Sequence, residues 1–162
     1  MTPSRRALAL PALLAAAAAQ APAQAQVPAP AAGARDLAGE ERNRRLVVDF
    51  YEAVFVRHDL GAAERFLSED YIQHNPRVPT GRAAFVAVFT RILAANPSAR
   101  SRVLRSATDG DLVFLHAHSR TSTEDRGRII VDIFRVAGDR IVEHWDVIQD
   151  IPETAANGNG ML

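Results

Sequence analysis

Six side chains that could bind a ligand or move protons recur between positions 74 and 146. They are His74, His116, His118, Asp132, His144 and Asp146. In the strand-like segments the carboxylates and imidazoles alternate with Ile, Val, Leu or Phe, so they fall on apolar faces. A polar group on such a face costs free energy unless it is hydrogen-bonded or used. The pattern therefore predicts a pocket that contains a functional polar cluster.

The stretch from Arg128 to Pro152 holds three of these six residues. Two runs rich in Ile and Val are separated by Ala-Gly-Asp, which is typical of a β-hairpin. Side chains of a strand alternate between faces, and this alternation puts Asp132 beside Ile130 and Phe134, and it puts His144 and Asp146 beside Ile148. We expect this face of the hairpin to line the pocket.

The register of this hairpin has two solutions. A four-residue connection would pair Val136 with Ile141, whereas the register that joins like faces sets Asp132 near Asp146. The turn sequence leaves the choice open, and a slip of one residue would exchange the faces. We favour the register that brings Asp132 and Asp146 together, because it keeps the polar side chains in one place.

The segment from Leu112 to Ser122 predicts a neighbouring strand. One face would carry Leu112, Phe114, His116 and His118, and the other Val113, Leu115, Ala117 and Ser119. We expect the face with the two histidines to line the same cavity as the hairpin. A partly desolvated carboxylate there has a raised pKa and can move protons near neutral pH, and an adjacent imidazole would complete an acid/base pair.

A metal ion is the competing use of the same side chains. Two histidines on a strand, a third histidine and a carboxylate could bind zinc, manganese or iron. The chain has no diagnostic spacing such as His-Glu-x-x-His, and no glycine-rich phosphate loop or dinucleotide fingerprint. Cysteine is absent, and every basic residue is arginine, which excludes thiol and Schiff-base chemistry. We expect neither a metal nor a cofactor.

Helices and further strands must position these residues. Apolar residues at helical spacing predict a helix from Glu41 to about Arg57; its stripe comprises Leu46, Val47, Phe50, Tyr51, Val54 and Phe55. A short helix over 62–67 with Asp59 as its cap, a strand over 71–75, a helix over 82–95 with Thr80 as its N-cap, and a strand over 100–107 follow. Helices followed by strands predict an α+β fold with one curved, mainly antiparallel sheet packed on three helices.

The other face of the hairpin is also apolar. It would carry Ile129, Val131, Ile133, Ile141, Trp145 and Val147. An antiparallel sheet in a monomer usually leaves one face polar. We therefore expect a homodimer that forms through the outer face of the sheet.

The N-terminal segment has the pattern of a secretory signal peptide. Arg5 and Arg6 precede an apolar run that ends in Ala23-Gln24-Ala25, so we expect cleavage after Ala25 and a periplasmic or secreted protein. Residues 26–39 predict a flexible linker, 40–152 one domain and 153–162 a disordered tail. The 19 basic and 19 acidic residues of the whole chain balance, which indicates neither nucleic acid nor a membrane as a partner.

Three motifs, YIQHNP, DLVFLHAHS and VDIFRVAGDRIVEHWDVIQDIP, resemble the SnoaL-like family of the NTF2-like superfamily. The resemblance implies a cone-shaped α+β barrel, frequent dimerisation through the sheet, and polyketide cyclases that close a ring by aldol condensation without metal or cofactor. It also implies catalysis by the aspartate of His-Trp-Asp, here Asp146. We predict Asp146, Asp132 and His118 as catalytic residues. The predicted substrate-binding residues are His74, His116, His144, Phe114, Phe134 and Tyr51.

The function that these residues and the resemblance predict is proton transfer next to a carbonyl, of the aldol-condensation, isomerase or lyase type. The substrate would be a small apolar carbonyl compound in an apolar pocket. Polyketide cyclases in the narrow sense act inside cells, whereas we expect this chain to be exported. The superfamily also includes proteins without catalysis. A non-catalytic protein that binds a small ligand, or a metal-binding variant, is the alternative.

Overall fold

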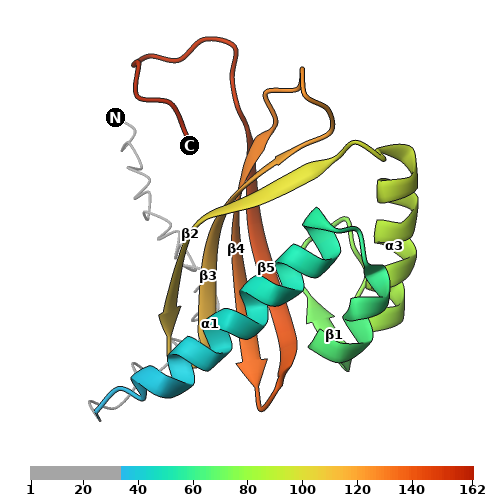
Figure 1. The fold of residues 1–162 in the computed structure, drawn as a ribbon, viewed down its shortest axis with the longest axis vertical. Helices are drawn as coiled ribbons and strands as arrows, with labels where there is room; N and C mark the ends of the chain where they lie inside the picture. The colour runs from blue at the N-terminus through green and yellow to red at the C-terminus, as the bar shows by residue number, and fades with distance from the viewer. Residues whose placement is uncertain (1–33) are drawn as a thin grey trace, which may run out of the picture. The chain divides into compact units, whose positions relative to one another are not determined.

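The computed structural model describes residues 34–162 and confirms the predicted α+β fold (Figure 1). The helical elements are α1 (Leu37–Tyr51), the π-helical turn η1 (Glu52–Val56), the 3₁₀ turn η2 (Leu60–Ala62), α2 (Ala63–Phe66) and α3 (Arg82–Ala95). The strands are β1 (Leu67–Gln73), β2 (Arg100–Asp109), β3 (Leu112–Arg120), β4 (Arg128–Ala137) and β5 (Arg140–Asp150).

The five strands form one curved sheet in the order β1-β5-β4-β3-β2. Strand β1 pairs with β5 in parallel, and the other neighbours are antiparallel. Helix α1 crosses one face of the sheet, and α3 lies beside β1 at the end of the sheet (Figure 1). The cavity described below lies under these helices, on what is called here the inner face.

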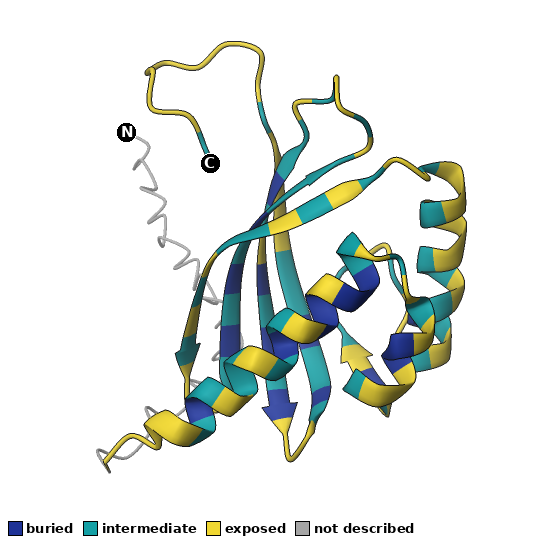
Figure 2. Cartoon of the chain, in the orientation of Figure 1, coloured by how far each residue is buried: buried dark blue, intermediate teal, exposed yellow. Residues whose placement is uncertain are grey.

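Helix α1 begins earlier than the sequence predicts. The Asp36 side chain accepts a hydrogen bond from Gly39 N at 2.9 Å and caps the helix, so residues 37–39 are helical and do not belong to a linker. The apolar stripe of the helix is buried against the sheet, with Val47, Phe50 and Val54 fully inaccessible (Figure 2). The helix ends in the π-helical turn η1, and Phe55 in that turn reaches the cavity.

Two local predictions between the helices were inexact. The strand predicted at 71–75 is longer and earlier, because it starts at Leu67 directly after α2. Thr80 was the wrong N-cap for α3. Gly81 occupies that position, and the Thr80 hydroxyl accepts a hydrogen bond from Gln73 N at 3.3 Å. Asp59 does cap its short helix, since its carboxylate accepts from Ala62 N.

A β-bulge in the β4–β5 hairpin reconciles the two registers. Asp132 lies opposite Asp146, as favoured, and Val136 nevertheless pairs with Ile141. Both pairings hold because the register shifts by one residue next to Val136, where β5 contains one extra residue, Val142. The bulge turns Ile141 into the core, where it is fully buried, so its predicted place on the outer face was wrong.

The faces of β3 are the reverse of the prediction. Leu115 lies opposite Asp132 and points inward together with Val113 and Ala117, whereas His116 lies opposite Val131 on the outer face. Both faces of this strand carry apolar residues, so alternation alone does not decide which one is covered. The smaller Ala117 and the aliphatic Leu115 pack under α1, and the polar imidazoles are left on the outer face.

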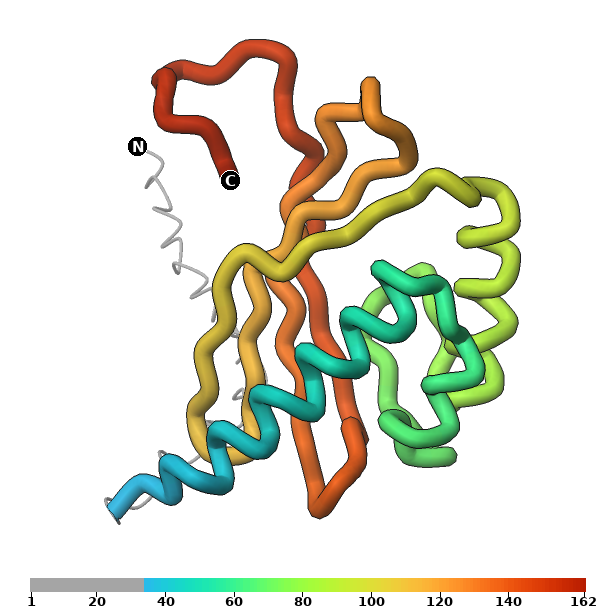
Figure 3. Tube along the Cα trace, viewed as in Figure 1, coloured from blue at the N-terminus to red at the C-terminus, as the bar shows by residue number. Residues whose placement is uncertain are grey.

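The chain after β5 contains no helix or strand, and Ile151 N donates to Gly127 O at 3.0 Å (Figure 3). None of the helices in residues 34–162 is long and apolar enough to cross a membrane. The predicted signal peptide and most of the predicted linker lie outside the described residues.

Candidate active site

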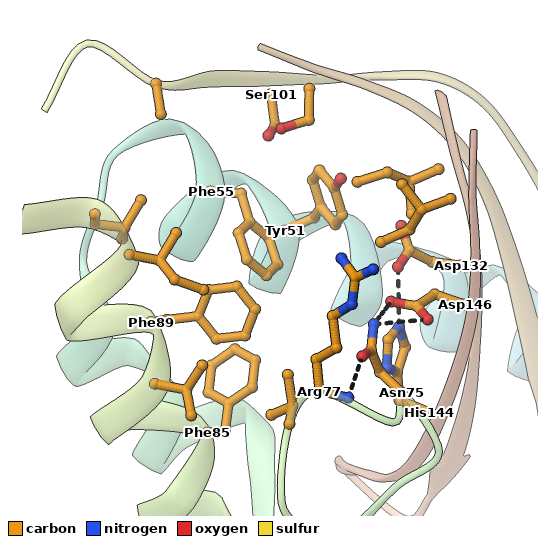
Figure 4. Close-up of a pocket in the computed structure, with 18 of the residues that line it drawn as sticks. Tyr51, Phe55, Asn75, Arg77, Phe85, Phe89, Ser101, Asp132, His144 and Asp146 are labelled. Atoms are coloured by element: carbon orange, nitrogen blue, oxygen red, sulfur yellow. Dashed lines mark hydrogen bonds and ion pairs between the residues drawn. The ribbon is translucent and has the colours of Figure 1, made fainter. Parts of the chain in front are cut away.

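A cavity of about 260 Å³ opens between the inner face of the sheet, α1, η1 and α3. One wall is aromatic and aliphatic, because helical and strand faces converge there. It consists of Phe50, Phe55, Tyr71, Phe85, Val88, Phe89, Ile92 and Leu93. The rings pack edge to face or tilted, with centroids 4.5 Å apart for Phe85 and Phe89. The opposite wall carries the acidic residues (Figure 4). The result is an apolar cavity with a few convergent polar groups, typical of small-molecule sites.

The polar wall is centred on Asp132, His144 and Asp146. Cross-strand pairing sets the two aspartates opposite each other on β4 and β5, and His144 lies two residues before Asp146 on the same face. His144 Nε2 and Asp132 Oδ1 are 2.9 Å apart (Figure 4). Only 5% of Asp132 and 6% of His144 are exposed. The hairpin register therefore creates a buried carboxylate–imidazole pair.

Gln73 fixes the tautomer of this imidazole. The Gln73 side-chain oxygen accepts from Asn75 N and lies 2.9 Å from His144 Nδ1, so this nitrogen carries the proton. The Gln73 amide nitrogen donates to the Tyr71 hydroxyl at 3.1 Å. With Nδ1 protonated, Nε2 is free to accept a proton from Asp132. Both ring nitrogens of His144 are thus engaged by the protein.

The environment of Asp132 favours its neutral form. Burial raises the pKa of Asp132 above its usual value, the hydrogen bond and charge of His144 act in the opposite direction, and Asp146 raises it again. Its Oδ2 is buried and has no hydrogen-bond partner among residues 34–162. An uncharged carboxyl oxygen is much less costly to leave unpaired than a carboxylate oxygen. The 2.9 Å contact between Asp132 Oδ1 and His144 Nε2 therefore requires one proton, which the two groups share.

Asp146 is held differently. Its two oxygens accept from the Asn75 side-chain nitrogen, at 2.9 and 2.6 Å, and the side chain is partly exposed to the cavity. The Asn75 oxygen in turn accepts from Arg77 N at 2.9 Å, which ties the loop after β1 to the carboxylate (Figure 4). Asp146 is therefore a carboxylate oriented at the boundary between the polar wall and the cavity.

Sequence reasoning missed Gln73 and Asn75. The motif Tyr71-Ile72-Gln73-His74-Asn75 drew attention to its histidine, although strand alternation puts Tyr71, Gln73 and Asn75 on one side and His74 on the other. The two amides line the cavity, and His74 does not. Alternation applied to this short strand was the signal that could have identified them.

Four predicted site residues lie outside the cavity. The His74 ring stacks on Trp145 with centroids 4.7 Å apart, and its Nε2 is 2.8 Å from Glu143. His116 is bonded to Arg105, and His118 Nε2 lies 2.8 Å from Arg126 O. His74, His116 and Phe114 were therefore wrong as substrate-binding residues. His118, predicted as catalytic, also lies outside the cavity, because it points to the outward face of β3.

The other three predicted pocket residues, His144, Phe134 and Tyr51, do line the cavity. Tyr51 is 2% exposed, and burial raises the pKa of its hydroxyl well above the usual value. The hydroxyl is therefore a neutral hydrogen-bond donor at physiological pH.

The same cluster could be considered for a metal. One ligand atom from each of Asp132, His144 and Asp146 lies within 4.8 Å of the others. In the observed arrangement His144 is bonded to Asp132, and the Asn75 amide points its hydrogens at Asp146. A cation would have to displace these donors. The arrangement therefore suits the movement of a proton better than the binding of a metal.

Several solved structures have a similar fold. An NTF2-like protein of unknown function from Mesorhizobium loti is 24% identical, with a TM-score of 0.57, over 68% of this chain and 93% of that one. A proposed SnoaL-like polyketide cyclase from Jannaschia sp. CCS1 has a TM-score of 0.60 at 14% identity, over 72% and 91%. A proposed ketosteroid isomerase from Kribbella flavida has a TM-score of 0.59 at 18% identity, over 73% and 85%.

No curated protein matches the chain. The SnoaL-like domain family matches residues 47–144, a range that includes Asp132 and His144 and ends two residues before Asp146. That range covers more than half of the chain, from the middle of α1 to the middle of β5. The fold agrees with the structural neighbours, and the resemblance seen in the sequence is confirmed. The chain belongs to the SnoaL-like domain family.

Proposed function

We propose that this protein is an acid/base enzyme that moves a proton next to a carbonyl group in a small, largely apolar substrate. The observation that carries the proposal is the Asp146 carboxylate, oriented by Asn75 at the edge of an apolar cavity and beside a buried Asp132–His144 pair. Aldol condensation, double-bond isomerisation and elimination all begin with such a proton transfer.

Asp146 is the general base of this proposal. It removes the proton on the carbon next to the carbonyl, and the electron pair of the C–H bond moves into the enolate. Asp132 shares its proton with His144, so the neighbouring carboxyl adds no second negative charge beside the base. Two carboxyl groups in unlike environments are a recurring way to separate the roles of acid and base.

The enolate oxygen needs a hydrogen-bond donor, and His144 is not free to be one. Gln73 and Asp132 occupy both of its ring nitrogens. The Tyr51 hydroxyl lines the same cavity and stays protonated because its pKa is raised, which makes it the donor in this proposal. Asp132, His144 and Asn75 are positioning residues, since they act through Asp146 and the shape of the site.

The proposal can be tested without knowing the substrate. A panel of ketones and diketones is incubated with the protein in D₂O, and exchange of the protons next to the carbonyl is followed by NMR. We expect Asp146→Asn to slow exchange by about 10³-fold, the usual scale for a general base. Asp70→Asn, on the exposed part of β1, is the matched control and should exchange at the wild-type rate. Exchange that survives in Asp146→Asn would disprove the assigned role.

A ligand-binding protein without catalysis is the second candidate, and the apolar lining of the cavity supports it. It predicts that a small molecule stays bound through purification and that no ketone exchanges faster than in buffer. Native mass spectrometry of the purified protein, combined with the exchange assay, separates the two candidates.

We also propose that the protein is exported and forms a homodimer. The Arg5–Ala25 pattern supports export, and N-terminal sequencing of the mature protein should find Gln26 first. The outer face of the sheet supports the dimer, because Val131 and Val147 are 41% and 70% exposed beside Trp145. Val147→Arg should then convert a dimer into a monomer in light scattering at micromolar concentration.

A further inference from the structure

An inward-facing arginine lies at the far end of the cavity from Asp146. Arg128 is the first residue of β4 and shares its face with Ile130 and Asp132, and all three line the cavity. It is half-buried. Four residues along a strand correspond to about 13 Å, so the Arg128 backbone lies about that far from the backbone of Asp132.

The Arg128 guanidinium has no direct hydrogen-bond or ion-pair partner in the described part of the chain. Within residues 34–162 its side chain forms no hydrogen bond and no ion pair, although Asp150 lies opposite it on β5. Arg135, on the same strand, is by contrast fully engaged, since it donates to Glu143 at 2.9 Å and to Asp111 at 2.7 Å. Arg128 also borders a surface pocket that carries Glu124, Asp125 and Asp150, but none of these carboxylates forms an ion pair with its guanidinium, so its donors remain available to an anionic ligand.

Two more arginines and several hydroxyl groups line the same cavity. Arg77 comes from the loop after β1, and Figure 4 shows its guanidinium directed to the space between Tyr51 and Asp146. Arg120 ends β3. Neither guanidinium is paired in the described part of the chain. The hydroxyl groups belong to Ser101, Ser119 and Thr121, and strand pairing sets Ser119 opposite both Ser101 and Arg128.

We propose that the cavity binds a carboxylate group of its ligand at Arg128, with Ser119 and Ser101 as neighbouring donors. A planar guanidinium binds a carboxylate through two parallel hydrogen bonds, and adjacent hydroxyls can satisfy the remaining lone pairs. Repulsion from Asp146 keeps this anionic end at Arg128. The apolar body of the ligand then lies against Phe55, Phe85 and Phe89.

This inference deepens the proposed function by naming the substrate class, and it rests on that function only for the orientation of the substrate. The substrate would be an apolar carboxylic acid whose reactive carbonyl is separated from the carboxylate by several bonds. Its carboxylate at Arg128 would direct the carbonyl toward Asp146 at the other end of the cavity.

The test compares two probes of the same shape, 2-naphthoate and the neutral 2-naphthamide, by titration calorimetry with the full mature chain. We expect the wild type to bind the carboxylate about tenfold or more tightly than the amide, because one charge-assisted pair contributes at least the energy of a tenfold change. Arg128→Gln should remove this preference and leave amide binding unchanged. Arg91→Gln, on the exposed side of α3, is the control and should keep the preference.

Equal affinity of the wild type for both probes would overturn the inference. So would a preference that Arg128→Gln and Arg91→Gln reduce alike, because that result indicates general attraction by surface charge. If Arg128→Gln weakened both probes through misfolding, Arg128→Lys would decide: retained preference for the carboxylate supports the site, and equal binding contradicts it.

Asp146→Asn separates this inference from the proposed function. It should bind 2-naphthoate at least as well as the wild type, since a negative charge is removed from the cavity. If Asp146→Asn abolishes proton exchange and the wild type shows no preference for the carboxylate, the proposed enzyme function is supported and the carboxylate site is rejected. If the wild type prefers the carboxylate but catalyses no proton exchange, the carboxylate site is supported and the proposed enzyme function is rejected.

Discussion

The two faces of the sheet carry the same kinds of residues and use them in opposite ways. On the inner face, His144 is buried between Gln73 and Asp132. On the outer face, His74 stacks on Trp145 and pairs with Glu143, which also accepts from Arg135. The outer cluster is partly exposed and its charges are compensated; the inner one has a buried carboxyl with an unpaired oxygen. Burial, rather than residue type, separates a candidate site from a surface network.

The largest effect should come from breaking the inner pair. His144→Ala leaves Asp132 buried without its hydrogen-bond partner and opens a cavity, which together cost about 3 kcal/mol or more. His74→Ala removes a stacked and partly exposed ion pair, and should cost about 1 kcal/mol or less. Urea unfolding of the two variants measures the difference. Equal losses would mean that the inner pair contributes no more to stability than the outer one.

A smaller effect should appear in the rate of proton exchange. Asn75→Ala removes the amide that orients Asp146 but leaves the base in place, so we expect a loss of about tenfold, at the low end of what a misplaced catalytic group costs. His74→Ala, the neighbouring residue on the other side of the strand, should keep the wild-type rate. A positioning role predicts that Asn75→Asp, which repels Asp146, exchanges more slowly than Asn75→Ala.

The pH dependence of stability provides a third comparison. The pKa of Asp132 is raised in the folded state, so the folded form binds its proton more tightly than the unfolded chain does. The stabilisation from this group is complete below the unfolded pKa of about 4 and is lost as the pH rises through the folded value. Asp132→Asn lacks that contribution. The difference in unfolding free energy between wild type and Asp132→Asn should therefore shrink as the pH rises from 4 toward neutrality.

The smallest effect is expected from metal removal. Dialysis against a chelator should change neither the thermal midpoint nor the exchange rate, because Asn75 and His144 already engage the carboxylates. The double variant His116→Ala/His118→Ala, on the outer face, should likewise keep the rate. If the exchange rate fell on chelation and returned when zinc was added, the reaction would depend on a metal ion and not on these residues alone.

Much of this arrangement could be predicted from the sequence. The hairpin was identified by two runs of Ile and Val around a Gly-containing turn, and the facing of Asp132 and Asp146 followed from keeping like faces together. The helices followed from apolar spacing, and the fold from the order of helices before strands. These signals are local or nearly local, and each is repeated over many residues.

The predictions that failed concerned which face of a strand points into the cavity, where no repeated pattern in the sequence decides. Strand β3 is apolar on both sides, so nothing in its alternation places His116 and His118 outside. Ile141 changed sides because a bulge adds one residue to β5, and a bulge depends on how the turn fits the pairing of the whole hairpin. Asn75 lies beyond the end of β1, where its contact with Asp146 spans 71 positions of sequence.

The bulge gives β5 one residue more than strict alternation requires. Loss of Val142 would produce a regular hairpin in which Ile141 still pairs with Val136 and Glu143 with Arg135, so His144 and Asp146 would keep their inward direction. Deletion of His144 or of Trp145 would instead turn the Asp146 side chain toward the outer face. The hairpin can therefore lose one residue at Val142 and still keep His144 and Asp146 on the inner face of the sheet.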